Sequence, residues 1–236
     1  MAIEWKNVSL FVGIPSMRGV QLEVLSSMLV LAAVASQRGV AMHFTGAKMP
    51  RTSAARGHIA YNFLQSGCTH LLFIDDDVQF DPASVLTMIE RDVPVIGVAY
   101  RTKTQDPRLQ EYDGGVGANF DEEPIGGTIR VQNLGSGFLL IKRHVIEQLA
   151  AAHPAYQWRP GINCLGMFNE IVHQGQFQME DTSFCIRWRA LGGELHLLLD
   201  APTVHLSGEH SWPGNYVEAW NRRRAQRGPG AQPIAQ

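Results

Sequence analysis

The stretch His70-Leu71-Leu72-Phe73-Ile74-Asp75-Asp76-Asp77-Val78-Gln79-Phe80 determines how the rest of the sequence is interpreted. Its apolar run follows turn residues and is typical of a strand that is buried on both faces, as in a parallel sheet. The run then changes abruptly into three carboxylates. In an extended backbone, Asp75 and Asp77 would point to one side and Asp76 to the other. Two acids held close together raise each other's proton affinity unless a cation lies between them.

One alternative is that these acids cap the next helix. That helix has its own start signal in Asp81-Pro82, with Asp as the N-cap and Pro in the first helical position. Capping therefore leaves Asp75 and Asp77 unexplained. The sequence instead predicts a divalent cation that prefers oxygen ligands, Mg²⁺ or Mn²⁺, at the end of this strand.

Strand and helix patterns alternate on both sides of this stretch. Apolar runs predict strands at 8–14, 40–45, 93–99, 128–133, 138–141 and 194–199. Helical spacing predicts helices at 21–37, 54–65, 82–90, 143–151 and 183–190. This alternation predicts an α/β fold with a mostly parallel, Rossmann-like sheet flanked by helices. We expect a single domain over residues 1–225, followed by a disordered tail at 226–236 that is rich in Gly, Pro, Gln and Ala.

The composition is that of an ordinary soluble globular protein. The chain has 236 residues, of which 45% are hydrophobic and 18% charged, and a formal net charge of -2. This charge gives no case for general attraction to nucleic acid or membranes. The three cysteines form no CxxC pair, which argues against a disulfide framework or a zinc site. The N-terminus lacks the apolar core of a signal peptide, and no apolar run is long enough to span a bilayer. We therefore expect a cytoplasmic protein without an integral membrane segment.

Three further residues are predicted to lie near the aspartates. Ligands of such sheets bind beyond the carboxyl ends of the strands. Pro15 ends the first strand, and Arg51 and Arg56 lie in or near the loop after the second. The two arginines are either solvated charges before a helix or groups that neutralise and orient phosphate. Gly135-Ser136-Gly137 matches no phosphate-binding fingerprint and is either a plain tight turn or a turn that lets the backbone come close to a sugar.

Glu180 and Asp181 form a second acidic pair. Asp181 could be the N-cap of the helix predicted at 183–190, or a carboxylate placed to accept a proton, and the two roles are compatible. The segment 155–178 upstream has several glycines and no clear periodicity. We expect it to form a loop that acts as a lid and brings an acceptor to this pair.

His205 and His210 are predicted to lie in the loop after the last strand. A histidine is more often hydrogen-bonded or at the surface than a metal ligand, but a neutral imidazole at this edge could complete the shell begun by Asp77. Arg222-Arg223-Arg224 is predicted to lie on a short terminal helix. A solvated face is the favoured explanation, and contact with phosphate or nucleic acid is the alternative.

In combination these motifs resemble those of GT-A-fold glycosyltransferases, especially the family 2 group. The resemblance runs from about Val8 to His210. Its parts are Ile14-Pro15-Ser16, Ala55-Arg56, Asp75-Asp76-Asp77, the run from Gly137 to Arg143, the run from Glu180 to Arg187, and Val204-His205.

The resemblance implies a role for each matched residue. Asp75 would contact the nucleoside, with Asp76 beside it, and Asp77 would hold the metal at the diphosphate. Asp75 and His205 are further candidate metal ligands. Asp181 or Glu180 would be the base; the choice stays open because Ser183 stands where the family often has another acid. Pro15 and Arg56 would lie near the nucleotide.

The implied reaction is an inverting transfer from a nucleoside-diphosphate sugar, with a UDP-sugar favoured, to an acceptor hydroxyl. The acceptor could be a glycan, a small molecule or a hydroxymethylated DNA base. Two other interpretations remain open. One is a sugar-phosphate nucleotidyltransferase, and the other is a non-catalytic module that binds nucleotide sugars or glycans.

Overall fold

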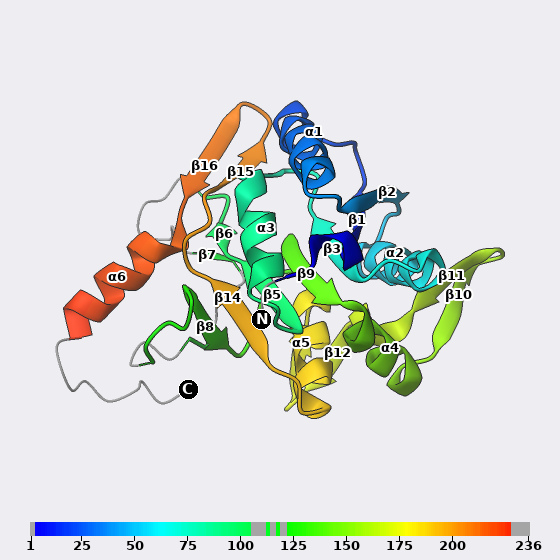
Figure 1. The fold of residues 1–236 in the computed structure, drawn as a ribbon. Coiled ribbons are helices and arrows are strands. Elements are labelled where there is room, and N and C mark those ends of the chain that lie inside the picture. The colour runs from blue at the N-terminus through cyan, green and yellow to red at the C-terminus, as the bar shows by residue number, and fades with distance from the viewer. Residues whose placement is uncertain (1–2, 105–111, 114–116, 119–121, 228–236) are drawn as a thin grey trace.

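The computed structural model describes residues 3–104, 112–113, 117–118 and 122–227. Its centre is a mixed sheet of seven strands (Figure 1). In spatial order these are β2 (Ala41–Lys48), β1 (Ser9–Ser16), β3 (His70–Ile74), β9 (Phe138–Lys142), β5 (Val95–Val98), β14 (Leu195–Leu198) and β8 (Thr128–Val131). β1 is parallel to β2 and β3, and β14 is parallel to β5, whereas β9 and β8 run antiparallel to their neighbours. The predicted α/β class with a largely parallel sheet is confirmed.

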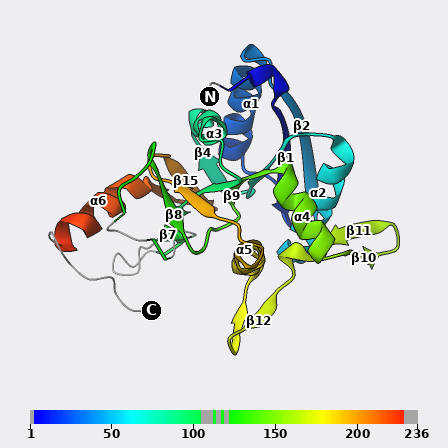
Figure 2. The ribbon, with the colours of Figure 1, turned by 60° about the horizontal axis from the view of Figure 1, so that its bottom comes forward.

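Helices cover both faces of the sheet (Figures 1 and 2). α1 (Leu22–Gln37) and α3 (Pro82–Glu90) pack on one face. α2 (Thr52–Ser66), α4 (Arg143–Ala152), α5 (Glu180–Ala190) and α6 (Tyr216–Arg227) contribute to the core on the other. None of the helices in the described part of the chain is both long enough and apolar enough to cross a bilayer.

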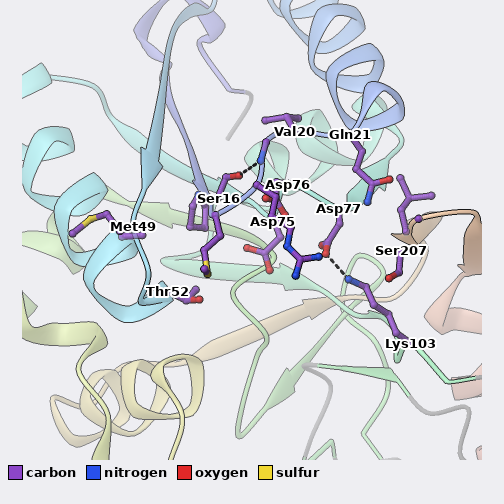
Figure 3. Close-up of a pocket in the computed structure, with 17 residues that line it drawn as sticks. Ser16, Val20, Gln21, Met49, Thr52, Asp75, Asp76, Asp77, Lys103 and Ser207 are labelled. Atoms are coloured by element: carbon purple, nitrogen blue, oxygen red, sulfur yellow. Dashed lines mark hydrogen bonds and ion pairs between the residues drawn. The ribbon is translucent and has the colours of Figure 1, made fainter.

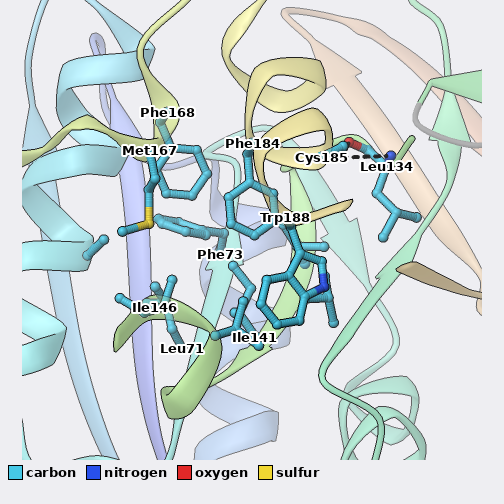
Figure 4. Packing of buried hydrophobic residues seen from close by; sticks show 14 of the residues in the cluster. Leu71, Phe73, Leu134, Ile141, Ile146, Met167, Phe168, Phe184, Cys185 and Trp188 are labelled. Carbon is cyan, nitrogen blue, oxygen red and sulfur yellow. Dashed lines mark hydrogen bonds between the residues drawn. The ribbon is translucent and has the colours of Figure 1, made fainter. Parts of the chain in front are cut away.

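The strand β3 contributes to both cores because successive side chains alternate across the sheet. Leu71 and Phe73 face α2 and α5, while Leu72 and Ile74 face α1 and α3. On the first side, Phe73 packs edge-on against Phe168, which stacks on Phe184 of α5 at 4.9 Å (Figure 4). These aromatic contacts hold the start of α5 beside the end of β3, and so bring the two acidic motifs together.

The start of α3 agrees with its sequence signal. The helix spans Pro82–Glu90, as predicted, and the Asp81 side chain accepts a hydrogen bond from the amide of Ala83 at 3.0 Å. The other predicted helices and strands of the sheet are present, and their ends differ from the predicted ends by no more than three residues.

Three local predictions are wrong. Asp75–Asp77 are not extended: β3 ends at Ile74, and a turn closed by the amide of Val78 and the carbonyl of Asp75 leads into β4 (Val78–Phe80). The alternating directions expected for the three acids therefore do not apply.

The two histidines also lie in strands and not in a loop. His205 lies in β15 (Thr203–Ser207), and His210 begins β16 (His210–Gly214). The two-residue turn Gly208-Glu209, with Gly208 at φ 59°, closes this hairpin.

The segment 155–178, expected to be an irregular loop, forms two hairpins. One pairs β10 (Ala155–Arg159) with β11 (Ile162–Leu165), and the other pairs β12 (Ile171–His173) with β13 (Gln176–Gln178). Gly161 and Gly175 have positive φ at their turns, which suits glycine.

Two helix ends also differ from prediction. α5 starts at Glu180 with Met179 as its N-cap residue, so Asp181 is not the cap. The reason is that acidic side chains in a first turn interact favourably with the positive end of the helix. Residues 226 and 227 of the predicted tail belong to α6, which ends at Arg227; residues 228–236 lie outside the described residues.

Candidate functional site

A cavity of about 680 Å³ lies at the carboxyl ends of β1 and β3, beside the start of α2 (Figure 3). The loop between β1 and α1, the acidic turn after β3 and the turn between β15 and β16 all contribute to it. Its lining includes Pro15, Ser16, Met17, Arg18, Thr52, Asp75, Asp76, Asp77, Lys103 and Ser207. The volume is in the range of sites for small molecules and cofactors.

The backbone of the acidic turn is hydrogen-bonded to three separate segments. The amide of Asp75 donates to the carbonyl of Gly137 at 2.9 Å. The carbonyl of Asp76 accepts from the amide of Gln21 at 3.0 Å, and that of Asp77 accepts from the amide of Leu206 at 2.8 Å. The carboxylates are therefore presented by a fixed backbone.

The predicted site residues fall into two groups. Pro15, Asp75, Asp76 and Asp77 line the cavity. Of those outside its lining, Arg56 and His205 contact Asp75 and Asp77, and Glu180 contacts Arg56. Arg51 and Asp181 have other partners.

Arg56 lies behind Asp75 instead of in the cavity. Its side chain is only 2% exposed, and Nη2 donates to Asp75 Oδ1 at 2.7 Å while Nη1 donates to the carbonyl of Ser136 at 3.0 Å. Burial alone would lower the pKa of this guanidinium, but Asp75 and Glu180 outweigh burial and raise it. The expectation that Arg56 meets phosphate directly does not agree with this geometry. Arg56 instead holds Asp75 in place.

Glu180 contacts the same guanidinium, with Oε1 3.7 Å from Arg56 Nε. Its side chain is 13% exposed. Burial raises the pKa of Glu180, Arg56 opposes this, and the nearby Asp181 adds to the increase. Arg56 therefore joins the two acidic motifs into one Asp75–Arg56–Glu180 network.

Asp181 has a different environment. Its Oδ1 accepts a hydrogen bond from the amide of Thr182 at 2.6 Å and lies 3.4 Å from the Thr182 hydroxyl. Its carboxylate thus interacts with the first turn of its own helix.

Asp77 lies between two basic side chains. Lys103 Nζ donates to Oδ2 of Asp77, and His205 Nε2 lies 3.5 Å from Oδ1. Burial would raise the pKa of Asp77, but the contacts with His205 and Lys103 outweigh it and hold the pKa below its ordinary value. Figure 3 shows Lys103 reaching Asp77 across the cavity. The sequence predicts a substrate-facing loop after residue 100, but nothing in that loop singles out Lys103.

The donor set at Asp77 suits a divalent cation. His205 Nδ1 lies 2.7 Å from the carbonyl of Arg101, which can only accept, so Nδ1 carries a proton, and Nε2, which faces Asp77, is the nitrogen that would bind a cation once it has lost its own proton. A hydrogen bond from one imidazole nitrogen to a backbone carbonyl is the usual way to orient a metal-binding histidine. Within the described residues, no cluster of three or more His, Cys, Asp or Glu side chains is arranged to hold a metal. Asp77 and His205 would thus supply two ligands, with the rest from substrate and water.

Gly137 allows Asp75 to approach the backbone of β9 closely. A Cβ atom at residue 137 would lie 2.4 Å from the Tyr100 hydroxyl and 2.6 Å from Asp75 Oδ2. The groups that lie closest to Gly137 are thus the Tyr100 hydroxyl and the Asp75 carboxylate.

The remaining basic candidates have other partners. Arg51 lies 3.8 Å from Glu170, with its side chain 64% exposed. Arg224 pairs with Glu123 and lies over the Trp220 ring. α6 carries the arginine cluster. It lies on the opposite side of the molecule from α2 in both ribbon views (Figures 1 and 2).

Comparison with solved structures identifies the fold. The chain is similar to A197 from STIV, with 19% identity over 88% of this chain and 94% of that chain and a TM-score of 0.53. The chain has a GT-A-like fold. This GT-A-like chain also matches UDP-glucose pyrophosphorylase complexed with UDP-glucose, with 8% identity and a TM-score of 0.46. The match covers 93% of this chain and 99% of that chain. It matches S. aureus TarS 1–349 with 10% identity and a TM-score of 0.44, over 93% of this chain and 65% of that chain.

The last two similarities are too low to support an argument. No protein-family model matches the chain, and a search of curated proteins finds no similar sequence.

Proposed function

We propose that the chain is a metal-dependent, inverting glycosyltransferase that moves a sugar from a nucleoside-diphosphate sugar to an acceptor hydroxyl. The observation that carries this proposal is the position of His205 Nε2, 3.5 Å from Asp77 Oδ1, beside a cavity that is also lined by Asp75 of the Asp75–Arg56–Glu180 network. The preference for a UDP-sugar rests on the family resemblance.

In this proposal, different residues at the cavity bind different parts of the sugar donor. Asp75, fixed by Arg56, accepts hydrogen bonds from the ribose. Asp77 and His205 hold Mg²⁺ or Mn²⁺, which when bound neutralises charge on the departing diphosphate. Arg18 and Lys103 line the same cavity and add positive charge near the phosphates.

Glu180 accepts the proton of the acceptor hydroxyl. It adjoins the donor-binding acids through Arg56, and burial moves its pKa upward, towards the range in which a carboxylate is an effective base near neutral pH. Asp181, whose carboxylate is bonded to Thr182, helps to stabilise the start of α5. Inversion follows if the acceptor oxygen attacks the anomeric carbon directly from the side opposite the diphosphate.

The test is release of nucleoside diphosphate from a panel of UDP- and GDP-sugars with Mn²⁺ or Mg²⁺. We expect turnover of one donor, loss of turnover in chelator and in Asp77→Asn, and unchanged turnover in the control Glu90→Gln, an exposed acid at the end of α3. Turnover in chelator would contradict the metal requirement. Pyrophosphate release from a nucleoside triphosphate and a sugar phosphate would instead identify a nucleotidyltransferase.

A further inference from the structure

The hairpin of β12 and β13 projects from the molecule immediately before α5 (Figure 2). Val172 and Phe177 are opposite each other in its register, and their side chains are 71% and 66% exposed. Opposite residues of an antiparallel pair lie on the same face, so these two form one apolar surface. Met179, 58% exposed, follows it towards Glu180. We call Val172, Phe177 and Met179 the hairpin face.

The base of this hairpin is anchored to the elements that build the site. Arg187 of α5 donates to the carbonyls of Met167 at 2.8 Å and Asn169 at 2.6 Å. Glu170 accepts a hydrogen bond from Ser53 of α2 at 3.2 Å, next to Thr52 in the cavity lining. A two-stranded hairpin is marginally stable alone, so these anchors fix where it stands relative to the cavity and to Glu180.

The charges around the hairpin face disfavour an anionic partner. Residues 171–179 contain no Asp, Glu, Lys or Arg, and carboxylates flank them at Glu170, Glu180 and Asp181. Three arginines lie near the hairpin: Arg51 and Arg56 pair with carboxylates, and Arg187 donates to the carbonyls of Met167 and Asn169. The arginines of α6 lie elsewhere, since Figures 1 and 2 both separate α6 from the hairpin. A nucleic acid docked here would be repelled by the acids, and each of the three nearby arginines already binds another group.

We propose that the hairpin face binds a neutral carbohydrate acceptor and directs its hydroxyl towards Glu180, an inference that rests on the proposed glycosyl transfer. The face of a sugar ring that carries C–H bonds packs against an aromatic ring such as Phe177, which offers a large apolar area at little cost in side-chain entropy. The neighbouring pair His173 and Gln176 lies on the opposite face of the hairpin, so in this proposal Val172 and Phe177 make the apolar contact and Glu180 receives the sugar hydroxyl. The hairpin face thus selects a glycan and disfavours a modified DNA base.

The test measures acceptor binding without donor, metal or turnover. Saturation-transfer difference NMR is recorded with maltoheptaose, cellopentaose and chitopentaose as neutral probes, and with duplex DNA containing hydroxymethylcytosine as the anionic probe. The variant Val172→Ser/Phe177→Ser is compared with Ile125→Ser, which replaces an 80% exposed apolar side chain elsewhere on the surface. Sedimentation velocity reports the oligomeric state of each variant.

We expect at least one neutral oligosaccharide to bind the wild type and Ile125→Ser, and to bind the double variant about tenfold more weakly, as expected when two apolar contacts are lost. Equal binding by the double variant, no binding of any neutral probe, or binding of the DNA alone would overturn the proposal. Dissociation of a wild-type dimer in the double variant would also overturn it, because the face would then be covered by a second copy. Failure of the proposed function is recognised separately, by the absence of nucleoside-diphosphate binding.

Discussion

Replacement of Arg56 by Met should strongly destabilise the protein and uncouple its two acidic motifs. Met replaces the aliphatic part of the Arg side chain but leaves Asp75 and Glu180 without the guanidinium that lies 2.7 Å and 3.7 Å from them. Their side chains are 26% and 13% exposed, so solvent screens them only partly. Removing one partner of a buried ion pair costs about 3–5 kcal/mol. This is a large share of the roughly 5–15 kcal/mol that stabilises a typical domain.

Urea unfolding at several pH values measures this effect. Burial raises the pKa of Glu180 while Arg56 opposes the rise, so the variant should have a still higher pKa at Glu180. A carboxyl group whose pKa is raised by folding favours the folded state at low pH, and this contribution is lost as the pH rises through the folded-state pKa. The deficit in unfolding free energy of Arg56→Met should therefore be largest near neutral pH and shrink as the pH falls towards the ordinary value of 4.5.

The double variant Arg56→Met/Glu180→Gln provides the control, because it removes one of the stranded charges. We expect it to be more stable than Arg56→Met at neutral pH and to show less pH dependence. A deficit of less than about 1 kcal/mol for Arg56→Met, the size typical of a surface ion pair, would refute the argument. So would a deficit that does not change with pH.

Three further predictions concern residues around the cavity. Lys103→Met should tighten Mn²⁺ binding, measured by electron paramagnetic resonance, because the Lys103 ammonium competes with the cation for Asp77. A partly exposed ion pair is worth up to about 1 kcal/mol, which corresponds to roughly fivefold in affinity. Weaker Mn²⁺ binding by the variant would contradict this competition. Gly137→Ala should lower the unfolding free energy by about 1–3 kcal/mol through overpacking against Tyr100 and Asp75; the control Gly46→Ala, whose added Cβ meets nothing closer than 3.8 Å, should cost less, and equal costs would be evidence against the close approach. Glu180→Gln should abolish sugar transfer while retaining nucleotide affinity, and Asp181→Asn should mainly lower the melting temperature. The reverse pattern would make Asp181 the base.

Much of the fold could be predicted from the sequence because its signals are local. The apolar run before Asp75 predicts a central strand, and Asp81-Pro82 predicts the start of α3; both agree with the structure. Pro15 and the three aspartates lie together in one cavity because the carboxyl ends of parallel strands meet at one edge of the sheet.

The features that sequence analysis missed depend on contacts between distant segments. The sequence around Arg56 is the same whether its side chain faces solvent or lies buried beneath Asp75. Only the packing of α2 against β3 and α5 determines which position the side chain takes. Lys103 reaches Asp77 from 26 residues away. The segment 155–178 has short strands whose pairing is specified by turns more than by apolar periodicity, so the two hairpins gave little signal.

The most direct test of the account is calorimetric titration of UDP into the wild type and into Asp77→Asn, with Mg²⁺ and in chelator. The account predicts that Mg²⁺ strengthens UDP binding to the wild type and that this gain disappears in Asp77→Asn, whose folding is checked by its melting temperature. UDP affinity that is the same with Mg²⁺ and in chelator, or a Mg²⁺-dependent gain that persists in Asp77→Asn, would contradict the claim that Asp77 holds the cation for a diphosphate.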